Sequence, residues 1–281
     1  MKITPEMIKI LRNKTQAGML NCKKALEKTE GNIEEAVLLL KKEGIIKATQ
    51  NSDKVAVEGL TNVAIRGNKA VLFELNTETD FVAKNQIFLN LYDKITELLL
   101  NSDETFTTVA DFLKSRAQNN SVQNFLLEAS AVLKEKIVLN RLQIVTKKTL
   151  ESFGFYKHQG GKISSLVVLS KECPAVAMDL PIHIVGFKPK FISKEKTDPQ
   201  FITKEKNFLL SKTLEEINQK KTLSSEIIDK IVNQRLNRFL EEICLLEQPL
   251  YNNSDQKVGE YLDKYQIQII AFYRFEVGER I

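Results

Sequence analysis

The sequence has 281 residues, 43% of them hydrophobic and 27% charged, which is enough apolar side chain for the buried cores of about two domains. Its 41 basic and 36 acidic residues leave a formal charge of +5, and they interleave without a block of five like charges, which excludes a strongly basic nucleic-acid-binding tail. Three scattered cysteines and two histidines exclude a disulfide framework and a zinc site, and no apolar run is long enough for a membrane span.

Residues 1–52 are predicted to form three short helices. Thr4 is a candidate N-cap of the first helix, and the second runs from about Gly18 to Lys28. Asn32 caps the third helix, which we expect to end at Gly44. A bundle of this size is marginally stable alone, so its outer apolar side chains are candidates for a docking surface. The polar stretch 47–54 is interpreted as a linker.

Residues 53–148 form the first predicted half of an α+β core. The segments on either side of the turn at 66–69 favour a β-hairpin over residues 55–75. A loop with the sequence NTETDFVAKN follows, and an apolar stripe from Ile87 to Leu98 then predicts a helix. We expect further helix through about Val145.

Residues 149–281 repeat this order of elements. Gly160 and Gly161 precede a predicted strand over 163–170, and a helix is expected around 175–185. The apolar run at 267–277 is expected to complete a second sheet. The repetition predicts a duplicated α+β core with antiparallel sheets.

An insertion at about 198–243 has a different pattern. It contains no glycine, and apolar residues recur at intervals of three and four, which predicts an antiparallel helical hairpin of coiled-coil type. Ser224 or Ser225 is the candidate N-cap of its second helix. The predicted inward residues are Leu210, Leu214, Ile217, Val232, Leu236, Phe239 and Ile243.

The motifs of nucleotide binding and hydrolysis are missing from the sequence. It contains neither GxxxxGK[ST] nor GxGxxG, and neither GxSxG nor HExxH. His183 lies in an apolar helix, where a buried structural histidine is the usual interpretation, whereas His158 lies beside two glycines and could contact a partner. We therefore expect a protein that is not an enzyme and needs no cofactor and no metal. The absence of a signal peptide at the N-terminus favours a cytoplasmic location.

Five segments resemble the bacterial-type translation elongation factor Ts family, in the family's own order. They are the helical segment LRNKTQAGMLNCKKALEKTEGNIEEAVLLLKKEGI, TDFVAK at 79–84, GFKPKFIS, LEQP at 246–249 and RFEVGE at 274–279. Together they span essentially the whole chain. The first segment resembles a ubiquitin-associated-type domain.

This resemblance implies guanine-nucleotide exchange on elongation factor Tu, with no direct contact to nucleic acid or membrane. In the family, the TDFV loop displaces Mg²⁺ from the partner's GDP site, which assigns this role here to Thr79, Asp80, Phe81 and Val82. Phe81 would insert between partner side chains and Asp80 would help to position it. The residues alone leave open another interpretation, with Phe81 in the core and Asp80 as a helix N-cap.

The resemblance also implies a docking surface for the partner's GTPase domain. Arg12, Met19 and Leu20 belong to it, and His158 matches a loop histidine of the second core half that lies towards the partner. Met19 and Leu20 are consecutive, so they cannot share one narrow helical stripe. At least one of them is therefore expected outside the small helical core.

The sequence departs from the family at two places. It ends three residues after Gly278, whereas some members continue into a further helical module, whose contacts we expect to be absent. Lys134 stands where some relatives have glycine. Two other interpretations stay open at this point: an RNA- or ribosome-associated binding protein, and an adaptor built on the ubiquitin-associated-like segment.

Overall fold

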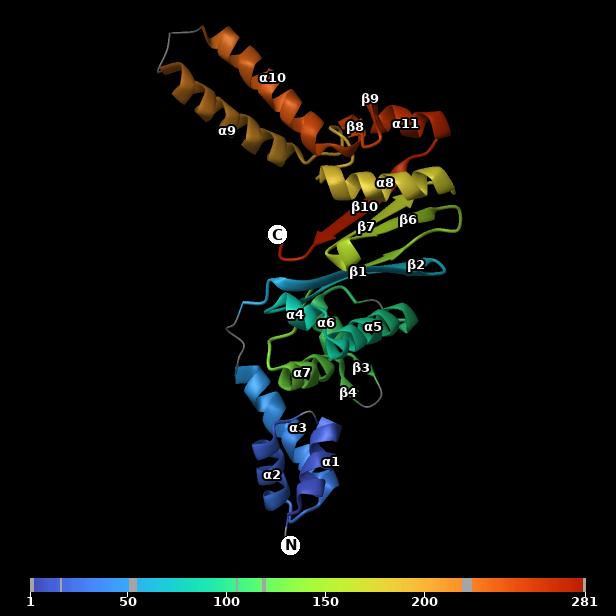
Figure 1. Ribbon diagram of the computed structural model, residues 1–281. Helices are drawn as coiled ribbons and strands as arrows, with labels where there is room; N and C mark the ends of the chain where they lie inside the picture. Colours follow the sequence, from blue (N-terminus) through green and yellow to red (C-terminus); the bar gives the residue numbers. More distant parts are fainter. Residues whose placement is uncertain are drawn as a thin grey trace. The chain divides into compact units, whose positions relative to one another are not determined.

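The computed structural model describes residues 3–15, 17–50, 55–104, 106–117, 120–218 and 224–279, with backbone alone at 45–50 and 217–218. It is an α+β structure, as the sequence predicts, with an N-terminal helical domain, two three-stranded sheets and a helical hairpin (Figure 1). The chain divides into two compact units. The first comprises residues 1–146, 157–163 and 275–281, and the second comprises residues 147–156 and 164–274.

The N-terminal helices are α1 (Pro5–Thr15), α2 (Met19–Lys28) and α3 (Ile33–Gln50). The hydroxyl of Thr4 accepts a hydrogen bond from the Met7 amide, and the Asn32 side chain accepts from two amides of the first turn of α3. Both predicted caps are therefore present. The helices enclose a small core of Leu11, Cys22, Ala25, Leu26 and Ala36.

The predicted end of the third helix at Gly44 is wrong, because α3 continues to Gln50. A glycine inside a helix costs about 1 kcal/mol relative to alanine. Here it permits close packing, since a Cβ at Gly44 would lie 2.9 Å from the Cβ of Ala131 in the neighbouring helix α7 (Val122–Leu133). The predicted linker thus begins within the helix, and its residues 51–54 lie outside the described residues.

The first sheet has the strand order β1–β2–β5, with β1 at Glu58–Arg66, β2 at Lys69–Thr77 and β5 at Val138–Thr146. All its neighbours are antiparallel, and the predicted hairpin turn is present, with Gly67 at φ +58°. The helices α5 (Gln86–Asn101), α6 (Val109–Lys114) and α7 lie on one side of this sheet (Figure 1). A two-stranded hairpin, β3 (Arg116–Ala117) and β4 (Asn120–Ser121), precedes α7.

Two predictions for this region are wrong. The helix expected through Val145 ends at Leu133, where Lys134 adopts φ +61° and its amide donates to the carbonyl of Ser130. The residues that follow form β5, whose Leu139 and Leu142 lie opposite Leu75 and Phe73 of β2. The loop expected after the first hairpin contains a one-turn helix, α4 (Asp80–Ala83).

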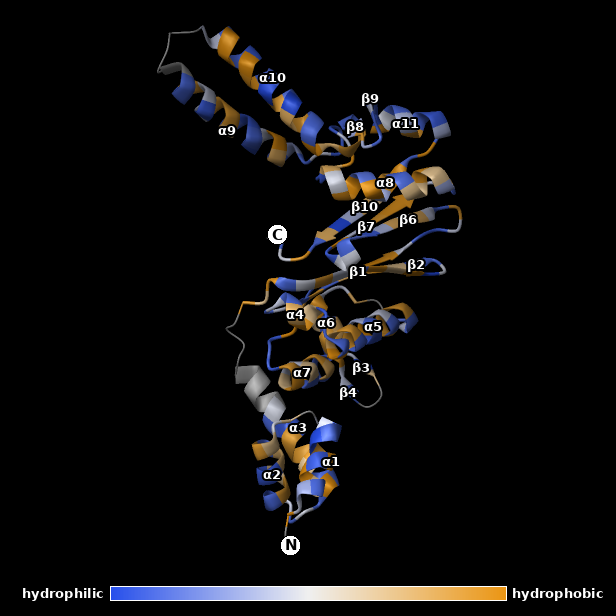
Figure 2. Cartoon of the chain, viewed as in Figure 1, coloured by the Kyte–Doolittle hydropathy of each residue, from blue (hydrophilic) through white to orange (hydrophobic). Residues whose placement is uncertain are grey.

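The second sheet has the order β10–β7–β6, with β6 at Ser152–His158, β7 at Ile163–Leu169 and β10 at Ile269–Glu276. Strand β6 was not predicted from the sequence. Helix α8 (Pro174–Phe187) is largely orange in Figure 2, in agreement with its buried apolar side chains Val176, Leu180 and Ile184. The remaining elements are the 3₁₀ turns η1 (Gln159–Gly161) and η2 (Leu245–Glu247), β8 (Pro249–Leu250), β9 (Asn253–Lys257) and α11 (Val258–Tyr265).

The inserted helical hairpin consists of α9 (Pro199–Asn218) and α10 (Ser225–Ile243), and Ser224 is the N-cap residue of α10. The inward stripe of α10 is confirmed, because Val232, Leu236 and Ile243 are buried and Phe239 is partly buried. The stripe of α9 is wrong at Leu214, which is exposed. Thr213 is buried instead and accepts a hydrogen bond from Arg235 of α10 at 3.0 Å. The side chain of Ile217 and most of the turn between the helices lie outside the described residues, and supercoiling of the pair stays a prediction.

Candidate functional site

Helix α4 presents Phe81 to solvent. The ring is 81% exposed, whereas Ala83 on the same short helix is buried and Val82 packs against the core of the first unit. Both parts of the alternative drawn from the residues alone are wrong, because Phe81 is not in the core and the N-cap is Thr79, whose hydroxyl accepts from the Val82 amide. Burying a fully exposed phenyl ring is worth about 1.5–3 kcal/mol, so this position favours a contact with another molecule.

Thr79, the residue before α4, is hydrogen-bonded to the turn between α7 and β5. Glu135 Oε1 accepts from the Thr79 hydroxyl at 2.7 Å, and its Oε2 accepts from the Thr79 amide at 3.0 Å and from the Thr77 hydroxyl at 2.9 Å. Glu135 was not predicted from the sequence. No local pattern indicates it, because only the pairing of β2 with β5 brings these residues together.

Asp80 is paired within the same helical turn. Its Oδ2 accepts from the Lys84 ammonium at 2.8 Å, and this hydrogen bond lowers the pKa of the Asp80 carboxyl below its ordinary value. The positive charge of Lys162 acts in the same direction. Asp80 is therefore ionised at neutral pH, next to the exposed ring, where it is available to pair with cationic or polar groups.

The turn that follows His158 lies on strand β1, which α4 also contacts. The carbonyl of Gly161 accepts from the Thr61 hydroxyl at 2.8 Å, and Lys162 pairs with Glu58 at 2.6 Å. A Cβ at Gly161 would lie 2.9 Å from the Thr61 carbonyl oxygen, so a glycine is required for this close approach. The fold thus brings the half-buried His158 and its turn to the strand that supports α4.

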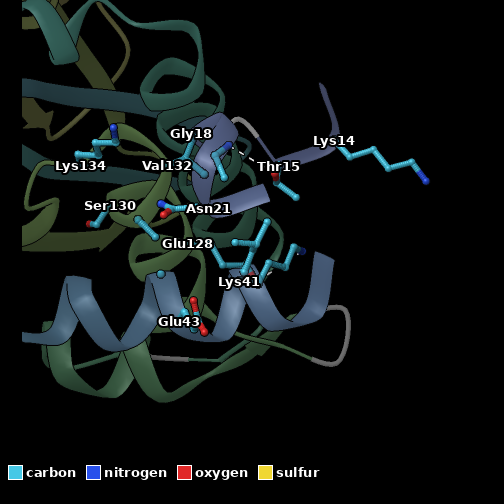
Figure 3. A pocket seen from close by; sticks show the side chains of 14 residues that line it. Lys14, Thr15, Gly18, Asn21, Lys41, Glu43, Glu128, Ser130, Val132 and Lys134 are labelled. Carbon is cyan, nitrogen blue, oxygen red and sulfur yellow. Dashed lines mark hydrogen bonds and ion pairs between the residues drawn. The ribbon is translucent and has the colours of Figure 1, made fainter. Parts of the chain in front are cut away.

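Arg12 lies on helix α1, and Met19 and Leu20 lie on helix α2. Met19 is 60% and Leu20 64% exposed, so both lie outside the small helical core, and Arg12 is exposed as well. A pocket of about 420 Å³ nearby is lined by residues of α1, α2, α3 and α7, among them Lys14, Lys41 and Glu128 (Figure 3). None of the three docking candidates lines this pocket.

The described residues contain no cluster of three or more histidine, cysteine, aspartate or glutamate side chains that could hold a metal ion. Within the same residues, no helix has the length and the apolar character needed to cross a membrane. The site therefore consists of an exposed aromatic ring, a neighbouring carboxylate and an apolar surface on the helical domain. An exposed aromatic ring can anchor a contact with another protein.

The profile of the family described as Elongation factor TS matches residues 78–279. A protein named Elongation factor Ts from Phytoplasma australiense is 47% identical over 281 residues, which cover 100% of both chains. The protein of the same name from Aster yellows witches'-broom phytoplasma (strain AYWB) is 46% identical over 99% of this chain and 100% of its own. That from Acholeplasma laidlawii (strain PG-8A) is 42% identical over 100% of this chain and 94% of its own.

The chain belongs to the elongation factor Ts family. Membership makes it a factor of translation elongation. The family match covers the TDFV segment, the turn after His158 and Glu135. The helical domain with Arg12, Met19 and Leu20 lies outside the matched range, but the full-length Elongation factor Ts relatives include it.

Proposed function

We propose that this protein is a guanine-nucleotide exchange factor of protein biosynthesis, which binds elongation factor Tu in its GDP form, displaces Mg²⁺ and releases GDP so that GTP can bind. The observation that carries the proposal is the exposure of Phe81 on helix α4, whose N-cap residue Thr79 is held by Glu135. A ring that is exposed and also firmly held can enter a partner's site and displace what is there.

The partner's chemistry makes this action sufficient. A GTPase of this kind holds GDP through backbone amides of its phosphate loop and through Mg²⁺, which offsets the phosphate charge. Displacing the metal weakens both interactions without making or breaking a covalent bond. In the proposal, Phe81 inserts next to the metal site, Val82 supports the ring from the core side, and Asp80 pairs with polar groups of the partner.

The energy for this step comes from both exposed surfaces. Weakening GDP binding a thousandfold requires about 4 kcal/mol of binding free energy. Burial of the Phe81 ring supplies about 1.5–3 kcal/mol. The remainder has to come from other contacts, and we assign it to the surface of Arg12, Met19 and Leu20 and to the turn after His158. This division explains why a single loop would not suffice.

The proposal includes no catalysis by the chain itself. The protein acts as a binding partner in the cytoplasm, requires no cofactor, and makes no direct contact with nucleic acid. His183, which lies in the apolar helix α8, forms a hydrogen bond with Gln248 at 2.9 Å inside the protein, and its ring is stacked on Phe187. This arrangement favours a structural role for it.

The test is the release of a fluorescent GDP analogue from purified elongation factor Tu, with this protein at about one twentieth of the partner concentration. With unlabelled GTP in excess to occupy the emptied sites, we expect complete release at a strongly increased rate, and at least about a tenfold slower release with Phe81→Ala. Leu150→Ala is the matched control, because Leu150 is also exposed, at 82%, and is assigned no role. Lack of acceleration by the wild-type protein would refute the proposal, and equal rates for Phe81→Ala and wild type would refute the role of the ring.

A further inference from the structure

Helix α4 cannot hold its own position. It has four residues, and one helical turn has no stability by itself. The ring of Phe81 makes little contact with the protein, so the position of the helix has to be fixed by its other residues and its N-cap. Packing of Val82 and Ala83 on the core fixes one side. The hydrogen bonds between Thr79 and Glu135 fix the other.

The turn that carries Glu135 is itself rigidly held. The amide of Lys134 donates to the Ser130 carbonyl at 2.8 Å, and the amide of Ile137 donates to the Ser130 hydroxyl at 3.0 Å. Lys134 adopts a left-handed conformation, which directs the chain back towards β2. Glu135 therefore projects from a backbone segment whose neighbouring amides are hydrogen-bonded.

A second glutamate, Glu78, connects the segment before α4 with the turn after α7 in the opposite direction. Glu78 Oε1 accepts from the amide of Lys136 at 2.8 Å, while Glu135 accepts from the amide of Thr79 at 3.0 Å. Each segment thus supplies a carboxylate to a backbone amide of the other. Hydrogen bonds to carboxylates are roughly twice as strong as neutral ones, so this reciprocal pair is a strong polar connection between the segment before α4 and the turn after α7.

We propose that Glu135 is a positioning residue for nucleotide exchange. It holds helix α4 so that Phe81 stays in position when it contacts the partner. The groups around the partner's metal site are then displaced, and the ring is not. The inference rests on the proposed function. Without the carboxylate, the ring would have to be ordered during binding, and part of the binding free energy would be lost to that ordering.

The first test follows the ring without any partner. The sequence has no tryptophan, so Phe81→Trp introduces a single indole whose fluorescence anisotropy decay reports local motion. We expect Glu135→Ala to increase the amplitude of this motion clearly. Glu128→Ala is the matched control, because Glu128 lies on α7 and pairs with Lys41 away from α4, and it should leave the anisotropy decay unchanged. Equal motion with and without Glu135 would overturn the proposal.

The second test measures GDP release at saturating factor. We expect Glu135→Ala to lower the saturating rate about tenfold, equivalent to losing about one hydrogen bond to a charged group, and to change the half-saturating concentration by less than about threefold. Glu135→Gln keeps one acceptor oxygen and should recover most of the rate. A general loss of folding would lower the active fraction of both variants and appear in thermal unfolding.

The decisive comparison is made in the Phe81→Ala background. If Glu135 acts through the ring, Glu135→Ala causes no further loss of rate there. An equal further loss would overturn the proposal. If the wild-type protein does not release GDP at all, the proposed function fails and the positioning role in exchange fails with it, whereas the anisotropy measurement still decides whether Glu135 holds α4.

Discussion

Replacing Arg141 tests how the C-terminal segment is held on the first sheet. The carboxylate of Glu74 in β2 is fully buried and lies opposite Arg141 in β5, whose Nε donates to it at 2.6 Å. The amide of Gly278 and the side chain of Asn76 also donate to this carboxylate. Arg141 Nη2 donates in addition to the carbonyl of Glu276 at 2.8 Å. Arg141→Met removes the cation and leaves the buried carboxylate in place.

The expected cost is large because the carboxylate cannot reach water. Removing one partner of a buried ion pair typically costs about 3–5 kcal/mol, and two remaining N–H donors on Glu74 place this case near about 3 kcal/mol. The double variant Glu74→Leu with Arg141→Met buries no charge and should recover most of that loss. For a urea dependence of about 2–3 kcal/mol per M, the single variant lowers the unfolding midpoint by about 1–1.5 M.

Urea unfolding followed by circular dichroism checks this prediction. The reasoning would be refuted if Arg141→Met cost less than about 1 kcal/mol, or if the double variant were as unstable as the single one. Lys28→Met is a useful comparison, because Lys28 pairs with Glu43 at the surface of the helical domain, and exposed pairs typically contribute about 0–1 kcal/mol.

Three further predictions concern stability and binding. Burial lowers the pKa of His183, so as the pH falls the unfolded state takes up a proton before the folded state does. The free energy of unfolding should therefore fall below about pH 6.5, by at most about 1.4 kcal/mol per pH unit. His183→Leu should remove this component from thermal unfolding measured between pH 8 and 5. Gly161→Ala should lower the free energy of unfolding by about 1–3 kcal/mol, since φ is +101° there and a Cβ would lie 2.9 Å from a carbonyl oxygen. Gly186 lies within α8 with open space around it, so Gly186→Ala should raise the free energy of unfolding by up to about 1 kcal/mol in the same urea assay. Met19→Ser with Leu20→Ser should weaken binding to elongation factor Tu by about tenfold or more in calorimetry and leave thermal unfolding unchanged, because both side chains are exposed; unchanged affinity would remove the helical domain from the interface.

Local patterns predicted the elements whose signals are contained within a few residues. The first hairpin follows from alternating apolar residues around Gly67, and the caps at Thr4 and Asn32 follow from side chains that reach the next amides. The errors arose where tertiary packing decides. Gly44 lies within a helix because Ala131 packs closely against it, and β5 forms a strand because β2 offers an edge to pair with.

The candidate site divides in the same way. Resemblance to the family pointed to Thr79, Asp80, Phe81 and Val82, and the exposure of the ring agrees with a role in contacting a partner. Glu135 was not predictable, because it is separated from Thr79 by more than fifty residues and is brought to it only by the sheet. Residues that position a site are found through contacts of this kind, which no local spacing encodes.

The central claim is that binding of this protein and binding of GDP to elongation factor Tu oppose each other. The most direct measurement is calorimetry of the protein with elongation factor Tu in its GDP-bound and its nucleotide-free forms. Thermodynamic linkage requires the protein to bind the nucleotide-free form more tightly, by the same factor by which it weakens GDP binding, and we predict about a thousandfold, or ~4 kcal/mol. Equal affinity for the two forms would contradict the account, because a protein that binds both equally cannot shift the equilibrium between them.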